Sequence, residues 1–303
     1  MSYNLITILG PTACGKTKLG VALAEYLNGE IISADSRQVY KQLDIGTGKD
    51  IHEYTIDEKK AIAYHLIDII DPKDEYNLFS YQSDFISVYN EIIKQSRVPI
   101  QVGGTGLYLS SIVQNYKLIK EDSSINLENL SDNELKGLLK KNKQSIHNTT
   151  DLLDRGRLEK AVKIAISGNK RNHSSKIIFN SLVIGIAPDR EIVRKRITAR
   201  LKQRLKEGMI DEVEGLLKSG ITHSRLNELG LEYRYLSLYL HRKVNYNDMF
   251  QKLNGAIHSF SKKQMTWFRK MEKEGVKINW IHEASLEKAK EIIEKVEFNF
   301  EAF

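Results

Sequence analysis

The chain has 303 residues, of which 41% are hydrophobic and 28% are charged, and this composition predicts a globular protein with a sizeable core. The single cysteine, Cys14, excludes an internal disulfide framework, and no apolar stretch approaches the length of a membrane span. We therefore expect a cytoplasmic protein that does not bind to membranes. The net charge of +7 agrees equally with a nucleic-acid partner and with a solvated basic surface.

The first predicted element is an apolar strand at 5–9, and it leads directly into a phosphate-binding motif. Residues 10–17 read Gly-Pro-Thr-Ala-Cys-Gly-Lys-Thr, and a helix is expected from Lys18 to Asn28. A strand, a loop bounded by glycines and a helix direct backbone N–H groups at one point, where they favour an anion. Lys16 adds a positive charge for a terminal phosphate, and the Thr17 hydroxyl is placed to bind Mg²⁺.

Strands and helices alternate over the next hundred residues. We predict strands at 30–34, 65–70 and 99–102, a helix that Ser80 caps and that runs to about Ser96, and a helix C-cap at Gly29. This alternation predicts an α/β fold, a P-loop NTPase-like parallel sheet flanked by helices. In such a sheet, ligands bind at the carboxyl ends of the strands.

The composition changes between about Lys117 and Lys176, where Asn, Lys, Ser and Asp are abundant. Residues 130–142 and 152–167 have helical patterns. We predict a small helical insertion domain at 117–176, between two parts of the core at 1–116 and 177–303. The apolar run 177–186 returns the chain to the sheet.

Long basic helices follow from Asp189, a predicted N-cap. Arg196, Arg200 and Arg204 recur every four residues on one helical face. They form either a solvated surface or a site where a guanidinium binds phosphate oxygens in a bidentate manner, and the sequence leaves both open.

The segment 259–273 mixes basic residues with Trp267. This mixture suits an RNA backbone with base stacking, but Trp267 equally suits a core position. A last strand at 277–281 and a helix capped by Ser285 complete the predicted core.

Polar residues follow two of the predicted strands at the edge where the phosphate loop lies. Asp35 is a candidate general base, a partner of Mg²⁺ or a helix cap. Gly103 and Gly104 permit close approach of a ligand, and the Thr105 hydroxyl can donate and accept hydrogen bonds. The segment 44–49, Asp-Ile-Gly-Thr-Gly-Lys, is expected where a substrate would lie.

In combination these segments resemble the bacterial tRNA dimethylallyltransferases, also called tRNA isopentenyltransferases. The resemblance is carried, in the order found in that family, by residues 10–17, 33–41, 44–49, 65–68, 102–108, 233–234 and 263–269. It implies transfer of a dimethylallyl group from dimethylallyl diphosphate to the exocyclic amine of the adenosine 3′-adjacent to the anticodon, with release of diphosphate. It further implies a monomer that binds the tRNA anticodon stem-loop and uses Mg²⁺.

The resemblance also implies roles for individual residues. Asp35 would accept a proton from the attacking amine, Thr105 would orient that amine, and Arg200 would stabilise the departing diphosphate. The implied diphosphate-binding residues are Gly10, Pro11, Thr12, Ala13, Cys14, Gly15, Lys16 and Thr17, the last also binding the metal. The implied tRNA contacts are Asp35, Ser36, Arg37, Gln38, Thr105, Gly156, Arg157, Leu158, Glu159, Lys160, Tyr233 and Arg234. Glu232 departs from the family, which usually has Gly before this Tyr-Arg pair.

Three other functions share parts of this pattern. A small-molecule kinase would also have a phosphate loop followed by an aspartate, but it leaves the basic C-terminal helices unexplained. A transferase that prenylates free adenine nucleotides would have little use for the insertion. A guanine-nucleotide switch needs an Asn-Lys-x-Asp element, which the sequence lacks.

Overall fold

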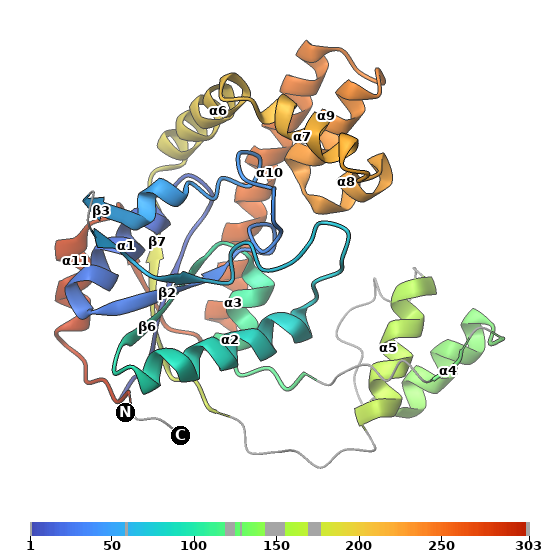
Figure 1. Cartoon of the computed structure of the whole chain (residues 1–303). Helices are drawn as coiled ribbons and strands as arrows, with labels where there is room; N and C mark the ends of the chain where they lie inside the picture. Colours follow the sequence, from blue (N-terminus) through green and yellow to red (C-terminus); the bar gives the residue numbers. More distant parts are fainter. Residues whose placement is uncertain are drawn as a thin grey trace. The chain divides into compact units, whose positions relative to one another are not determined.

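The computed structural model describes residues 2–57, 60–118, 125–127, 129–142, 155–168 and 177–300 (Figure 1). It divides the chain into two compact units. The first unit consists of Met1–Asn115 and Ile178–Phe303, and the second of Tyr116–Ile177.

A parallel sheet, six-stranded in the described residues, forms the centre of the first unit. Its spatial order is β5 (Tyr64–His65), β2 (Gly29–Ala34), β6 (Val98–Gly103), β1 (Leu5–Leu9), β7 (Ser181–Ile186) and β8 (Ile278–Ile281). Gly103 pairs with both Ala34 and Leu9, so β2, β6 and β1 end side by side. This register brings the segments that follow these strands to one edge of the sheet, as the predicted α/β fold requires.

Helices cover both faces of the sheet (Figure 1). Ile6 and Ile8 of β1 pack in one core with residues of α1 (Lys16–Leu27) and α11 (Leu286–Ile293). On the other face, Gln101 donates a hydrogen bond to Tyr81 of α2 (Leu78–Lys94), which packs against α3 (Gly106–Val113). Burial of both faces explains why β1 is apolar along nearly its whole length.

A layer of helices with its own core follows β7. It contains α6 (Arg190–Lys206), α7 (Met209–Lys218), α8 (His223–Leu229), α9 (Leu231–Leu240) and α10 (Tyr246–Lys273). Val39 and Leu43, from the segment after β2, are buried in this core. The segment after β2 is therefore packed against the helical layer. The chain after it forms the short elements η1 (Ile51–Tyr54), β3 (Thr55–Asp57) and β4 (Lys60–Ala61).

The second unit contains α4 (Asp132–Asn142) and α5 (Arg155–Gly168) among its described residues. Leu135 and Leu139 of α4 pack against Leu158 and Val162 of α5. Both helices were expected at these places, although residues 152–154 of the second expected helix lie outside the described part of the chain.

Several predicted boundaries are wrong. The strand expected at 65–70 ends at His65, because Leu66 and Asp68 adopt the left-handed conformation at φ 62° and 57°. The N-cap of α2 is Asn77, whose side chain accepts the N–H of Ser80. The C-cap of α1 is Asn28 rather than Gly29, which is the first residue of β2.

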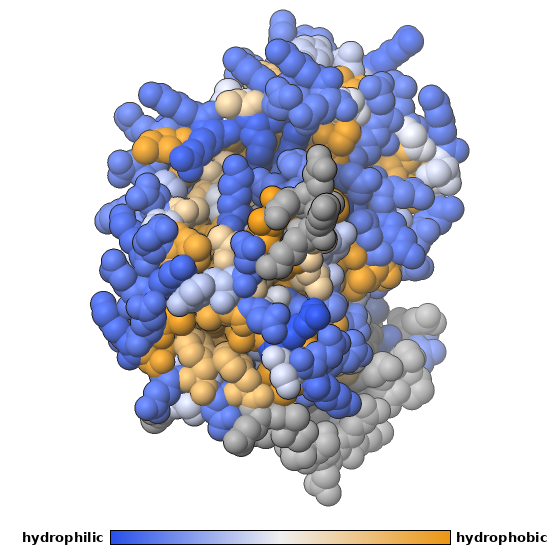
Figure 2. All heavy atoms as spheres, turned by 60° about the vertical axis from the view of Figure 1, so that its left-hand side comes forward, coloured by the Kyte–Doolittle hydropathy of each residue, from blue (hydrophilic) through white to orange (hydrophobic). Residues whose placement is uncertain are grey.

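The face shown in Figure 2 is mostly hydrophilic, with patches of hydrophobic residues between the hydrophilic ones. Within the described residues, no helix combines the length and the apolar composition needed to cross a membrane.

Candidate active site

The phosphate-binding motif forms a loop between β1 and α1. Gly15 has a positive φ of 92°, and α1 begins at Lys16, two residues before the predicted start. The first N–H groups of a helix have no intrahelical partner, so this end of α1 favours an anion. The Lys16 ammonium donates a hydrogen bond to the carbonyl of Pro11 at 2.7 Å, which holds its charge over the loop. The Cys14 side chain is buried beneath the loop as a free thiol.

A cavity of about 660 Å³, here called the loop cavity, lies against residues 12–18. Its lining includes four basic residues and four acidic residues: Lys16, Lys18, Arg196 and Arg200, and Asp35, Asp50, Glu53 and Glu283. Its apolar lining comes from Ala13, Tyr54, Val102, Ala199 and Phe260. A phosphate-binding floor with an apolar wall suits a small molecule that joins a phosphate to a short hydrocarbon.

A further cavity of about 640 Å³, here called the helix cavity, is lined largely by α8, α9 and α10. It shares Asp35, Arg200 and Gln264 with the loop cavity. The rest of its wall includes basic residues and a tryptophan: Arg37, Arg204, Arg234, Lys263 and Trp267. The geometry therefore suits two ligands that meet beside Asp35 and Arg200.

Asp35 follows β2 directly, as the sequence indicated. One oxygen of its carboxylate accepts the N–H of Arg37 at 2.8 Å and that of Gln38 at 3.4 Å. The chain forms a turn and no helix directly after Asp35, so the helix-cap interpretation is wrong; its carboxylate fixes this turn, and Asp35 lines both cavities. The Thr105 hydroxyl accepts the Ser36 N–H at 3.0 Å, which joins the ends of β2 and β6.

The three arginines on one face of α6 differ in their surroundings, so neither a solvated surface nor a phosphate site describes all of them. Arg196 is exposed, whereas Arg200 is half-buried and donates to the Thr12 hydroxyl in the phosphate loop. Arg204 is buried and forms an ion pair with Asp50 at 3.1 Å. Burial and the neighbouring charge of Arg204 lower the pKa of Arg200 to about 10, so Arg200 remains a cation at neutral pH.

Gln264 is a site residue to which the sequence analysis gave no role. Its side-chain oxygen accepts the Thr12 N–H at 2.9 Å, and its amide group donates to the carbonyl of Gly104, also at 2.9 Å. The signal was its position on α10, where it shares the buried face of Ile257, Ser261 and Phe268. A polar side chain within such a face requires buried partners.

Glu232 also lines the helix cavity. Burial raises the pKa of its carboxyl, although the charges of Arg204 and Arg200 oppose this shift. The departure from the family pattern noted at this position therefore places an additional acidic group beside the two arginines.

The expected tRNA contacts of the first unit differ in their accessibility. Arg37 and Arg234 are exposed at the helix cavity, and the Arg234 guanidinium donates to the Asn227 carbonyl. Gln38 lines the loop cavity and donates to the carbonyl of Gly48 at 2.9 Å. Tyr233 is fully buried, so its hydroxyl acts inside the protein, where it donates to Glu212.

The remaining expected contacts, 156–160, belong to α5 of the second unit. Lys160 and Gly156 are exposed and Glu159 is half-buried, whereas Leu158 is packed in the core of the unit. The side chain of Arg157 lies outside the described part of the structure.

The oxygen ligand available at the phosphate loop fits a Mg²⁺ ion that is bound together with a phosphate group. The Thr17 hydroxyl lines the loop cavity, and the described residues contain no cluster of three His, Cys, Asp or Glu side chains able to enclose a metal. Mg²⁺ commonly takes one or two protein oxygens and completes its shell with phosphate oxygens and water, and a single hydroxyl such as that of Thr17 fits this kind of site.

Comparisons with known proteins identify the relatives of this chain. The model of the IPP transferase family matches residues 38–271, and that of isopentenyl transferase matches residues 3–61. The tRNA dimethylallyltransferase 1 of Geotalea uraniireducens is 50% identical over 93% of both chains. The tRNA dimethylallyltransferase 1 of Syntrophus aciditrophicus is 49% identical over 96% of this chain and 97% of its own.

Comparison with solved structures gives the same family. The tRNA isopentenylpyrophosphate transferase of Bacillus halodurans superimposes with a TM-score of 0.67 at 30% identity, over 97% of this chain and 94% of its own. A eukaryotic dimethylallyltransferase that acts on tRNA reaches a TM-score of 0.72 at 22% identity, over 92% of this chain and 74% of its own, and so shares the fold.

Proposed function

The chain belongs to the IPP transferase family and transfers a dimethylallyl group to tRNA, and we propose that the acceptor is the exocyclic amine of the adenosine 3′-adjacent to the anticodon. The observation that carries this proposal is the meeting of the loop cavity and the helix cavity beside Asp35 and Arg200. Neither a kinase nor a transferase for free adenine nucleotides is favoured by the relatives of the chain.

The donor is dimethylallyl diphosphate, bound in the loop cavity. Its diphosphate accepts hydrogen bonds from the N–H groups at the start of α1 and forms ion pairs with Lys16 and Arg200. Thr17 would hold Mg²⁺, which when bound neutralises charge on the diphosphate. The apolar wall of the cavity suits the five-carbon group.

The acceptor nucleotide binds in the helix cavity. The exposed cations Arg37, Arg234 and Lys263 suit the RNA backbone, and Trp267 offers a ring for stacking. The Trp267 indole donates to the Ser110 hydroxyl at 2.7 Å, which fixes its ring. Removing the base from the anticodon-loop stack costs roughly a few kcal/mol, less than extrusion from a duplex.

The reaction replaces a carbon–oxygen bond by a carbon–nitrogen bond. The exocyclic nitrogen attacks the first carbon of the dimethylallyl group, the bond to the diphosphate oxygen breaks, and Asp35 accepts the proton that the nitrogen loses. Thr105 orients the amine, while Lys16 and Arg200 stabilise the charge on the leaving diphosphate. Because an adenine amine is a poor nucleophile, positioning and leaving-group stabilisation supply most of the rate.

We also propose that the protein acts as a monomer in the cytoplasm.

The acceptor is tested with synthetic anticodon stem-loops. A stem-loop with adenosine at the 3′-adjacent position should accept the label, and a matched one with purine riboside there, which lacks only the amine, should not. Equal labelling of the two would overturn the proposed acceptor.

A further inference from the structure

The segment after Tyr40 looks like an anion-binding loop but binds groups of the protein itself. It reads Asp-Ile-Gly-Thr-Gly-Lys at 44–49, a glycine-rich run that ends in lysine. Thr47 lines both the loop cavity and the helix cavity, and Gly48 lines the loop cavity. This segment and the following Asp50 are here called the 44–50 loop. Its position therefore sets the shape of the wall that the two cavities share.

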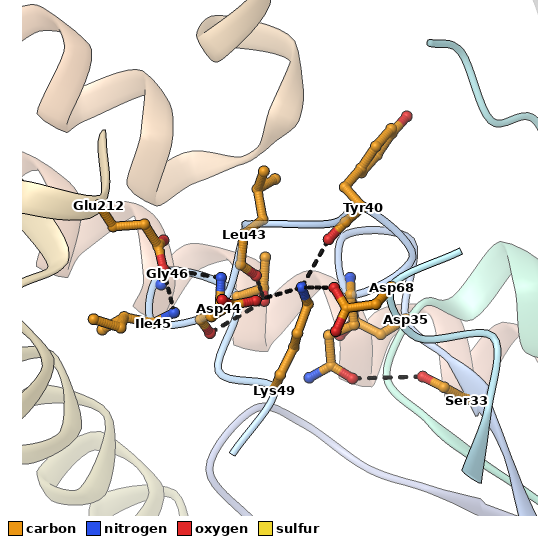
Figure 3. Close-up of polar contacts among 12 residues, drawn as sticks. Ser33, Asp35, Tyr40, Leu43, Asp44, Ile45, Gly46, Lys49, Asp68 and Glu212 are labelled. Carbon is orange, nitrogen blue, oxygen red and sulfur yellow. Dashed lines mark hydrogen bonds and ion pairs between the residues drawn. The ribbon is translucent and has the colours of Figure 1, made fainter. Parts of the chain in front are cut away.

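The carboxylate of Glu212, on α7, lies beside residues 44–46 of the 44–50 loop (Figure 3). One of its carboxylate oxygens accepts the N–H groups of Asp44 at 2.9 Å and Ile45 at 2.6 Å. The other oxygen accepts the N–H of Gly46 at 3.0 Å. Three successive backbone N–H groups around one anion form a nest, and in this protein the anion is an internal carboxylate.

Tyr233 supplies a fourth donor to the same carboxylate. Its hydroxyl donates to Glu212 at 2.8 Å, and burial together with the charge of Glu212 raises its pKa, so it remains a donor. A Cβ added at Gly46 would lie 2.6 Å from the Tyr233 hydroxyl oxygen, so only glycine fits there. Glu212 thus joins the 44–50 loop to α9, which also lines the helix cavity.

Lys49 fixes the other end of the loop from inside the protein. It is 2% exposed, and its ammonium donates to the Tyr40 carbonyl at 2.8 Å and to the carboxylates of Asp44, at 2.6 Å, and Asp68 (Figure 3). The lysine of this glycine-rich run therefore binds protein groups and is not placed for the diphosphate.

The end of the loop reaches the arginines of the site. Asp50 pairs with Arg204, and the Arg204 guanidinium occupies the space where any side chain at Gly48 would lie. A shift of the 44–50 loop would therefore move Thr47, Gly48 and the partner of Arg204 together.

We propose that Glu212 is a positioning residue for the transfer reaction: its carboxylate holds the 44–50 loop so that donor and acceptor meet in productive alignment. This inference rests on the proposed function in assigning the two cavities to the two substrates. Glu212 lines neither cavity, so it would act through the N–H groups of residues 44–46.

The variant Glu212→Gln tests the inference, since it keeps the size of the side chain and replaces an accepting oxygen by an N–H donor. The control is Glu214→Gln on the same helix, where the only ion pair is an exposed one with Lys218 at 3.9 Å among the described residues. Hydrogen exchange followed by mass spectrometry measures directly how strongly Glu212 holds the N–H groups of residues 44–46. We expect exchange of the N–H groups at 44–46 to be at least about tenfold faster in Glu212→Gln, and unchanged in Glu214→Gln.

Steady-state kinetics test the consequence. We expect kcat of Glu212→Gln to fall at least about tenfold with KM for both substrates within about threefold, because alignment contributes mainly to the chemical step. Tyr233→Phe removes one donor and leaves the three loop N–H groups, so its kcat should lie between wild type and Glu212→Gln. It also serves as the readout if Glu212→Gln folds poorly.

Unchanged exchange at 44–46, or faster exchange with unchanged kcat, would overturn the inference, and a fall in thermal stability alone would not support it. If the wild-type protein itself transfers no label to tRNA while the exchange results are as expected, the proposed function is wrong. The finding that Glu212 holds the 44–50 loop would then still stand.

Discussion

The side-chain oxygen of Gln264 accepts the backbone N–H of Thr12 at 2.9 Å, which joins helix α10 to the phosphate loop across 252 positions of sequence. The same side chain donates to the Gly104 carbonyl, so it links the loop to the turn that carries Thr105. Arg200 reaches the hydroxyl of the same threonine from α6. The loop therefore depends on two helices from the far end of the chain.

We expect Gln264→Ala to weaken both donor binding and turnover. It leaves the half-buried Thr12 N–H and the buried Gly104 carbonyl without this partner, and an unsatisfied buried group costs about 1–3 kcal/mol. Donor affinity, measured by titration with dimethylallyl diphosphate, should fall about tenfold. Thr266→Ala, on the exposed face of the same helix, is the matched control. Equal affinities in the two variants would show that this link does not shape the donor site.

Asp35→Asn separates the two roles of Asp35. An amide oxygen can still accept the Arg37 N–H and keep the turn, but it cannot accept a proton from the amine. We expect kcat to fall about 10²–10⁴-fold while donor affinity stays within a few-fold. Single-turnover transfer to tRNA measures this, and a variant with nearly wild-type rates would remove Asp35 as the base.

Thr17→Ala should raise the Mg²⁺ concentration needed for half-maximal rate, whereas Thr17→Ser, which keeps the hydroxyl, should not. Lys16→Ala should weaken donor binding at every Mg²⁺ concentration, because it removes a charge and not a metal ligand. Rates are compared over a Mg²⁺ titration. The same Mg²⁺ dependence in all three variants would contradict the role assigned to the loop.

The raised pKa of Glu232 predicts a pH-dependent effect on stability. A carboxyl whose pKa is higher in the folded than in the unfolded state favours folding while protonated, and this contribution is lost as pH rises through the folded-state pKa. Glu232→Gln has no such titration. Its melting temperature relative to wild type should therefore be higher at about pH 8 than at about pH 4, near the usual pKa of glutamate. A difference that is independent of pH would contradict the predicted titration.

Local sequence patterns predicted the features of the fold that depend on neighbouring residues. The phosphate loop, the strands on either side of it and the cap at Ser285 follow from spacing and residue type within a few positions, and each is observed. The prediction of a strand at 65–70 was wrong because contacts with residues outside the local sequence determine the conformation there. Asp68 turns to bind Lys49, and the N–H groups of residues 68–70 donate to Gln38 and Val39.

The same reason explains what the sequence did not reveal of the site. Asp35, Thr105 and Arg200 could be proposed because each follows a recognisable pattern, whereas the role of Glu212 depends on N–H groups 166 to 168 positions away. The polar, glycine-rich run 44–49 was expected where a substrate would lie, but its sequence did not indicate that its N–H groups bind a side chain of the protein. Only the folded chain brings these partners together.

The most direct test of the account is transfer of radiolabel from dimethylallyl diphosphate to unmodified tRNA, with Mg²⁺ and without ATP, beside AMP as an alternative acceptor. The account predicts label in tRNA at the adenosine 3′-adjacent to the anticodon and none in AMP. Label in AMP alone, or no transfer without ATP, would contradict it.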